Sequence, residues 1–344
     1  MLQKVIGGEM EIAHDAPVRC LLSPEDIAGL GTAYSSGRSA LLAILRHISG
    51  RGVRRVFLPD YLCASVVETV RFAGLAYEFY NLDASLMPAA GLAERTSDSD
   101  AVLLINYFGM QDHSATVRHL RSAGNAVIIE DDVQAFYSYQ NPKTDNADYR
   151  FTSLRKWFPV PDGGLAMASD GTALPAFSRE NLFWVYKYSG LLLKGAGSGG
   201  DDSLFLDILR KGEQMIDSEI ECAVSDCTIR LFAGVDIVAA AQKRRTNAAS
   251  LQEGLRNIGI TPLLQQSGGD VPFFIPVCLA NRDEVRAKMF ENNIFCPVHW
   301  PLEGLPLQTG ARLEAHELSL IADQRYSETD MARILEILSK YARQ

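Results

Sequence analysis

One lysine of this chain stands out because of the residues around it. Lys156 is followed by Trp157 and Phe158, has Ser153 three positions before it, and precedes a glycine pair at positions 163 and 164. A surface lysine is normally solvated and charged, whereas apolar surroundings lower the pKa of an amine and favour its neutral, reactive form. A neutral lysine amine can form a Schiff base with a carbonyl compound. The segment therefore predicts a nucleophilic lysine.

An acid at the end of an expected strand supplies the second part of this chemistry. The apolar run at 126–129 leads into Glu130, Asp131 and Asp132, and strand alternation points Asp131 into a crevice at the strand end. A carboxylate there could keep a pyridine nitrogen protonated, and Gln134 could donate to the ring oxygen of the same cofactor. With Lys156, this predicts a pyridoxal-phosphate enzyme, with Glu130 and Asp132 left open as alternative acids.

A phosphate site is expected at the start of the first long helix. Gly37, Arg38 and Ser39 stand where this helix begins, and the free backbone amides of a helix N-terminus attract anions. The same residues also fit an ordinary serine cap with a glycine turn. Ser153, close to Lys156, is a second candidate for binding phosphate.

The elements that must position these residues follow a clear order. Short apolar runs alternate with helical patterns in the first half of the chain, which is typical of a parallel sheet with crossover helices. Ligands of such sheets bind beyond the carboxyl ends of the strands. We expect an α/β fold, with a large domain (1–240) whose mainly parallel sheet is flanked by helices, and a smaller α+β C-terminal domain (241–344). Strands are expected at 55–59, 77–80, 101–105, 126–129, 165–167 and 271–277, and helical segments at 39–47, 64–72, 225–255, 282–292 and 327–342.

Composition narrows the class of protein. The 344 residues are 47% hydrophobic, enough for a large core, and the formal charge of -9 argues against a nucleic-acid or anionic-membrane surface. The six cysteines include no Cys-x-x-Cys pair, so no metal or redox site is predicted. The first residues lack the apolar stretch of a signal peptide, and no apolar run reaches the roughly 18 residues of a membrane span. A cytoplasmic location is the expectation.

Taken together, these segments resemble the DegT-type sugar aminotransferases, a family of fold-type I pyridoxal-phosphate enzymes. The resemblance implies that Lys156 forms the Schiff base with pyridoxal phosphate and that Asp131 pairs with the pyridine nitrogen. It also implies that Gln134 contacts the ring oxygen, and that Ser153 with the amides of Arg38 and Ser39 binds the phosphate. The segments that carry the resemblance, in the order of the family, are 36–41, 58–61, 72–74, 106–109, 129–135, 153–164 and 298–301.

The chain also departs from the family pattern. Where the family often has an aromatic residue over the cofactor ring this chain has Cys63, so Tyr61 is expected to stack instead, or the ring is less tightly covered. Arg38 replaces a threonine-like residue, and the lysine segment is shorter than usual. Candidates for an acceptor pocket with hydroxyl and aromatic groups are Arg38, Tyr107, His299 and Trp300.

The resemblance favours an aminotransferase that works as a homodimer on an amino donor and a keto-sugar, nucleotide-linked and used in surface-glycan or related biosynthesis. Two alternatives stay open. One keeps the cofactor but catalyses another reaction, such as dehydration or aldol cleavage, and the other is a homologue that has lost catalysis. A nicotinamide dehydrogenase is disfavoured because no Gly-x-Gly-x-x-Gly motif opens the first helix.

Overall fold

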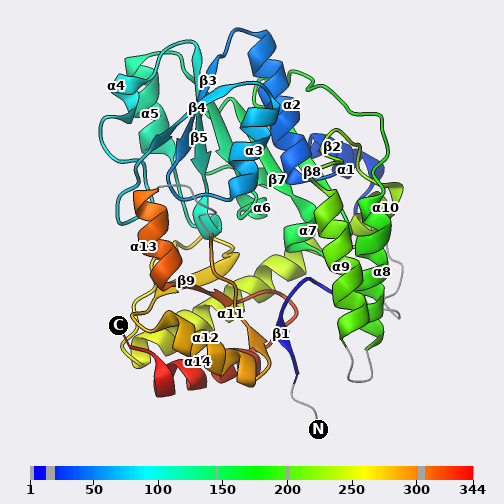
Figure 1. Cartoon of the computed structure of the whole chain (residues 1–344), viewed down its shortest axis with the longest axis vertical. Coiled ribbons are helices and arrows are strands. Elements are labelled where there is room, and N and C mark those ends of the chain that lie inside the picture. Colours follow the sequence, from blue (N-terminus) through cyan, green and yellow to red (C-terminus); the bar gives the residue numbers. More distant parts are fainter. Residues whose placement is uncertain (1–3, 13–19, 145, 198–201, 301–306, 344) are drawn as a thin grey trace.

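A seven-stranded sheet forms the centre of the larger part of the molecule in this computed structural model, which describes residues 4–12, 20–144, 146–197, 202–300 and 307–343. Neighbouring strands from β7 to β4 are parallel, whereas β8 is antiparallel to β7 and β2 is antiparallel to β8. The expected mainly parallel sheet is therefore confirmed (Figure 1). In spatial order the strands are β2 (Thr32–Tyr34), β8 (Gly164–Ala168), β7 (Tyr149–Ser153), β6 (Val127–Asp131), β5 (Asp100–Ile105), β3 (Arg55–Pro59) and β4 (Ala76–Tyr80).

Helices connect the strands and cover the sheet. The longest of them, α2, packs against β7 and β8 and buries Leu41, Leu42 and Leu45. Apolar residues occupy more than one face of this helix, so most of its surface is removed from water. The helical elements of this part are α1 (Pro24–Gly29), α2 (Gly37–Gly50), α3 (Ala64–Phe72), α4 (Leu92–Arg95), the 3-10 turn η1 (Tyr107–Gly109), α5 (Ser114–Ala123), α6 (Phe136–Gln140) and α7 (Leu154–Trp157).

Two strands of the sheet, β2 and β7, were not expected from the sequence. In β7 all five residues are buried, yet Arg150, Thr152 and Ser153 are polar and hide the usual apolar pattern of a central strand. The burial is possible because Arg150 forms an ion pair with Glu130 on β6, at 2.8 Å between Nε and Oε2, and Thr152 donates to the carbonyl oxygen of Asp132.

A helical hairpin and a short helix follow the sheet. Helices α8 (Phe183–Ala196) and α9 (Ser203–Met215) pack along each other, and α10 (Asp226–Ala233) comes next. The long helical segment expected at 225–255 is in fact two helices, because α10 ends before Gly234 and α11 (Ile237–Asn257) begins three residues later. The Asp236 side chain caps α11 by accepting from the amide of Ala239.

The C-terminal part has its own apolar core and lies below the sheet in Figure 1. Strand β9 (Phe274–Cys278) pairs antiparallel with β11 (Glu317–Ile321), and β1 (Ile6–Gly7) from the other end of the chain pairs with β10 (Ile294–Phe295). The helices here are α11, α12 (Arg282–Glu291), α13 (Gln308–His316) and α14 (Glu328–Tyr341). The boundary expected near residue 240 falls in the first turn of α11, and the division into two domains stays a prediction.

Within the described ranges, no helix is long and apolar enough to cross a membrane. In the same ranges, no three or more His, Cys, Asp or Glu side chains gather in a way that could bind a metal ion.

Candidate active site

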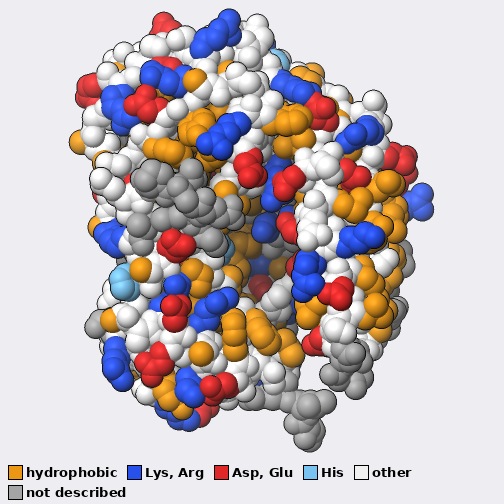
Figure 2. Space-filling model, viewed as in Figure 1, with side chains coloured by type: hydrophobic (Ala, Val, Ile, Leu, Met, Phe, Trp, Pro, Cys, Tyr) orange, Lys and Arg blue, Asp and Glu red, His pale blue; other side chains and the backbone are white. Residues whose placement is uncertain are grey.

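A cavity of about 130 Å³ lies beyond the carboxyl ends of β6 and β7, where sequence reasoning placed the ligand. Its walls come from the start of α2, from α3, from α9, from residues 153–156 and from the segment that contains His299 and Trp300. Figure 2 shows a hollow on this face of the molecule, with Lys and Arg side chains inside it and acidic side chains at its rim. Segments far apart in sequence therefore meet at one site.

The start of α2 is held close to the sheet by a glycine. A Cβ atom at Gly164 would lie 2.1 Å from the carbonyl oxygen of Ser36, so no larger residue fits on β8 at this point. The Ser36 hydroxyl caps α2 by accepting from the amide of Ser39, at 3.1 Å. The amide of Ser39 is thus already bonded, and Ser39 is not part of the cavity wall, unlike Gly37 and Arg38.

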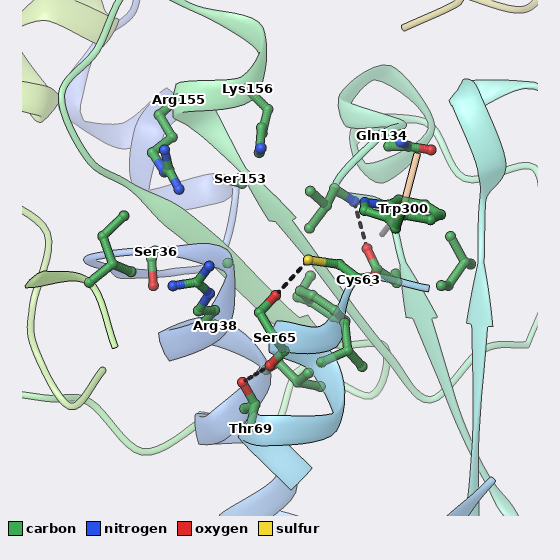
Figure 3. A pocket seen from close by; sticks show the side chains of 18 of the residues that line it. Ser36, Arg38, Cys63, Ser65, Thr69, Gln134, Ser153, Arg155, Lys156 and Trp300 are labelled. Atoms are coloured by element: carbon green, nitrogen blue, oxygen red, sulfur yellow. Dashed lines mark hydrogen bonds between the residues drawn. The ribbon is translucent and has the colours of Figure 1, made fainter. Parts of the chain in front are cut away.

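Two arginines form a cationic side of the cavity. Figure 3 shows Arg38 and Arg155 pointing toward each other, on the same side as Ser36. Each is paired with a carboxylate from α9 or the turn after it: Arg38 with Asp217, and Arg155 with both oxygens of Glu213, at 2.9 Å each. Two guanidinium groups beside a helix N-terminus are suited to bind a phosphate group.

The side chain of Lys156 projects into the cavity between this cationic side and Gln134 (Figure 3). The Lys156 side chain is exposed to the solvent that fills the cavity, although protein surrounds the cavity itself. Burial, followed by the charge of Arg155, lowers the pKa of the Lys156 amine. Sequence reasoning expected this direction but credited the aromatic neighbours, whereas Trp157 and Phe158 point into the apolar core and the specific neighbour is Arg155.

Asp131 lies in the cavity wall at the end of β6, with 5% of its surface exposed. Its Oδ1 atom accepts from the amide of Val133 at 2.9 Å, and no basic side chain of the described residues contributes to its pKa. Burial raises the pKa of Asp131 to about 7. A buried carboxylate without a cationic partner is suited to bind a positively charged ligand atom.

The two neighbouring acids have other partners. Glu130 binds Arg150 and accepts from the hydroxyl of Thr144, and Asp132 accepts from the side-chain NH₂ group of Asn106 at 3.2 Å. Neither contributes to the cavity wall. Of the three acids that the sequence left open, the geometry therefore favours Asp131.

Gln134 also lies in the wall, on the far side from the arginines (Figure 3). Its Oε1 atom accepts from the amide of Phe108 at 3.0 Å, which leaves the NH₂ group as the donor available to a ligand. Ser153 contributes to the wall too, although its hydroxyl makes only a long contact of 3.4 Å to the carbonyl oxygen of Gly163.

The aromatic residues are arranged differently from the expectation. Tyr61 and Tyr107 are buried and stack on each other, with ring centroids 5.5 Å apart, and neither is part of the cavity wall. Trp300 packs edge-on against Tyr61 and reaches the cavity, as do Phe151, Phe273 and Cys63 from the start of α3. Pro301, which followed Trp300 in the resemblance, lies outside the described residues.

Sequence reasoning missed part of the wall. Arg155 was given no role although it precedes Lys156, and its charge next to a reactive lysine was the available signal. Glu213 could not be found, because it is 58 residues from its partner and its helix has the pattern of any amphipathic helix. Ser65, which donates to the sulfur of Cys63 two residues away, was also given no role, although it lies within the helix expected at 64–72.

Comparison with known proteins shows similarity in structure only. No protein-family model matches the chain, and no curated protein sequence matches it. Among solved structures, a putative sugar aminotransferase from Streptococcus pneumoniae, Spr1654 in its PMP form, is 15% identical with a TM-score of 0.65, and 98% of this chain and 97% of that chain are covered. DesV from S. venezuelae, solved in complex with a ketimine intermediate, is 17% identical with a TM-score of 0.63, covering 95% of this chain and 92% of that chain.

A third match is a DegT DnrJ EryC1 StrS aminotransferase from Brucella abortus, which is 16% identical with a TM-score of 0.60 and covers 95% of this chain and 92% of that chain. The chain thus has the fold of the sugar aminotransferases of this type, and the predicted fold class is confirmed. Spr1654 has been solved in both PLP and PMP forms.

Proposed function

We propose that this protein is a pyridoxal-phosphate-dependent aminotransferase. The observation that carries the proposal is that Lys156, the cationic start of α2 and the unpaired carboxylate of Asp131 all line a single cavity. A phosphate, an aldehyde and a pyridine nitrogen on one flat ring require three such groups around one site. The fold shared with sugar aminotransferases supports the same conclusion.

The residues of the chain divide the work of binding the cofactor. Gly37, Arg38 and Arg155, with Ser153, would bind its phosphate, and the NH₂ group of Gln134 would bind its ring oxygen. Asp131 would hold a proton on the pyridine nitrogen, because the charge pair relieves the cost of burying an unpaired carboxylate. When bound, pyridoxal phosphate supplies an electron sink that stabilises negative charge on the amino-acid carbon.

Lys156 would bind the aldehyde covalently. Its nitrogen would then accept and donate a proton during the reaction. Its lowered pKa provides a larger fraction of neutral amine at neutral pH than an exposed lysine has. The positive charge of Arg155 contributes to this lowered pKa. Glu213 orients the guanidinium of Arg155 by accepting two hydrogen bonds from it. Phe273 and Trp300 contribute apolar surface to the same wall.

The acceptor we propose is a keto-sugar, nucleotide-linked, in surface-glycan or related biosynthesis. Several of the similar structures are named sugar aminotransferases, and Trp300 gives the cavity an aromatic face of the kind that packs against sugar groups. A homodimer in the cytoplasm is part of the same proposal.

The test is to purify the protein with pyridoxal phosphate, record its visible spectrum, reduce it with borohydride and map the labelled peptide. We expect the label on Lys156, and Lys156→Ala should bind the cofactor without a covalent link. Lys194→Ala is the matched control, because Lys194 is also a lysine with a lowered pKa but lies away from the cavity wall. A label on Lys187 or Lys194 would refute the assignment of the nucleophile.

The reaction class is tested on the same preparation. Addition of glutamate should convert the bound cofactor to its pyridoxamine form, and nucleotide keto-sugars should convert it back. A dehydratase or aldolase would not cycle in this way, and a protein without catalysis would show no spectral change. Recovery of the original spectrum only with simple keto acids would exclude the sugar assignment and keep the aminotransferase.

A further inference from the structure

Two buried polar residues on β11 contact His299 in the wall of the cavity. Glu317 and Ser319 are fully buried and, being two residues apart on one strand, project from the same face, whereas Leu318 and Leu320 project from the other face into the C-terminal core. Glu317 accepts from the backbone amide of His299 at 2.8 Å, and Ser319 lies 2.8 Å from Nδ1 of the same histidine.

The hydrogens of this chain of contacts can be counted. The Ser319 hydroxyl donates its only hydrogen to Oε1 of Glu317, while Oε2 of Glu317 accepts from the His299 amide. Both carboxylate oxygens therefore accept, as an ionised carboxylate must. Because the Ser319 hydrogen is already used, the contact between Ser319 and His299 needs a hydrogen on Nδ1 of the ring.

The ring itself is neutral. Burial, followed by the charge of Lys156, lowers the pKa of His299 to about 3. A neutral ring that carries its hydrogen on Nδ1 has a lone pair on Nε2. Since Nδ1 faces Ser319 on β11, Nε2 is on the edge of the ring away from the strand, and His299 and Lys156 both form part of the cavity wall.

We infer that Glu317 and Ser319 fix His299 in the Nδ1–H form, so that its Nε2 lone pair positions the amine of Lys156 by accepting a hydrogen bond from it. His299 acts as a positioning residue here, through the lysine. A neutral acceptor orients the amine without placing a further charge beside Lys156 and Arg155. A free neutral imidazole in water prefers the opposite form, with the hydrogen on Nε2. The protein would therefore favour the form of His299 that is less common in water.

The role of His299 rests on the proposed function of Lys156, but the ring form does not and can be measured separately. The protein is labelled with ¹⁵N-histidine, freed of cofactor, and studied by long-range ¹H–¹⁵N NMR at pH 9, where Glu317, whose pKa burial raises to about 7, is ionised. His299→Gln identifies the resonances of this ring among those of the six histidines. We expect an unprotonated Nε2 and a protonated Nδ1 at His299.

Two variants of Ser319 complete the test. Ser319→Ala removes the acceptor for the Nδ1 hydrogen and should move the ring to the Nε2–H form, whereas Ser319→Thr keeps a hydroxyl and should keep the Nδ1–H form. In the same samples, the pKa of the Lys156 amine, followed by its rate of acylation against pH, should change in Ser319→Ala and not in Ser319→Thr.

An Nε2–H ring in the unmodified protein would overturn the inference whether or not Ser319→Ala folds. An unchanged ring form in a folded Ser319→Ala would overturn it as well. Failure of the proposed function would look different: no borohydride label on Lys156, with the ring form of His299 unaffected.

Discussion

Replacement of Asp131 by asparagine should change how the stability of the cofactor-free protein depends on pH. An aspartate has an ordinary pKa of about 4 in an unfolded chain, and burial raises the pKa of Asp131 to about 7 in the folded protein. Between these two values the folded state holds a proton that the unfolded state has lost. The contribution of Asp131 to stability therefore falls as the pH rises from about 4 to about 7, and stays constant above that.

The size of the effect follows from the difference between the two pKa values. About 3 pH units correspond to about 4 kcal/mol, an upper value because a buried carboxylate can relax toward the solvent of the cavity. Asparagine keeps the shape of the side chain and never ionises. We expect Asp131→Asn to match the unmodified protein in stability at pH 4 and to exceed it by up to about 4 kcal/mol at pH 8.

The assay is urea denaturation of both cofactor-free proteins between pH 4 and pH 8. Asp207→Asn is the control, because Asp207 is on α9 with its side chain 67% exposed and should give a curve parallel to that of the unmodified protein. Parallel curves for Asp131→Asn would refute the buried, unpaired carboxylate. Saturating pyridoxal phosphate should then stabilise the unmodified protein more than Asp131→Asn at pH 8, since only the carboxylate can pair with a protonated ring nitrogen.

Two further predictions concern packing and assembly. Gly164→Ala should destabilise the protein by roughly 1–3 kcal/mol in urea denaturation and weaken binding of pyridoxal phosphate, since its Cβ atom would meet the carbonyl oxygen of Ser36 at 2.1 Å. Gly50→Ala at the end of α2, where no atom lies within 4 Å, should be neutral, and equal effects of the two would contradict this account. Leu182 and Val185, 60% and 44% exposed, should lie in the proposed homodimer contact, so changing both to glutamate should yield a monomer in analytical ultracentrifugation. A monomer before the change would contradict the dimer.

The sequence alone was enough to predict five of the seven strands of the sheet and its mainly parallel arrangement. Strands β3, β5 and β6 are short apolar runs between helical patterns, and such a pattern is local, so it can be recognised without knowing what packs on it. The same locality places Asp131 at the end of a strand. Strand β7 was missed because two of its buried residues, Arg150 and Thr152, are polar. Their burial is favourable only because they pair with groups in or next to β6, which a local sequence pattern does not show.

The residues of the cavity wall were harder to predict, because several of them meet only in the tertiary structure. Lys156 was recognised from its immediate neighbours, but Glu213 comes from α9 and the Glu317–Ser319 contact to His299 from β11. Whether Tyr61 or Trp300 reaches the cavity was also decided by packing between distant segments. Strand periodicity reflects interactions between residues a few positions apart, whereas these contacts depend on the path of whole loops and helices, which no short segment encodes.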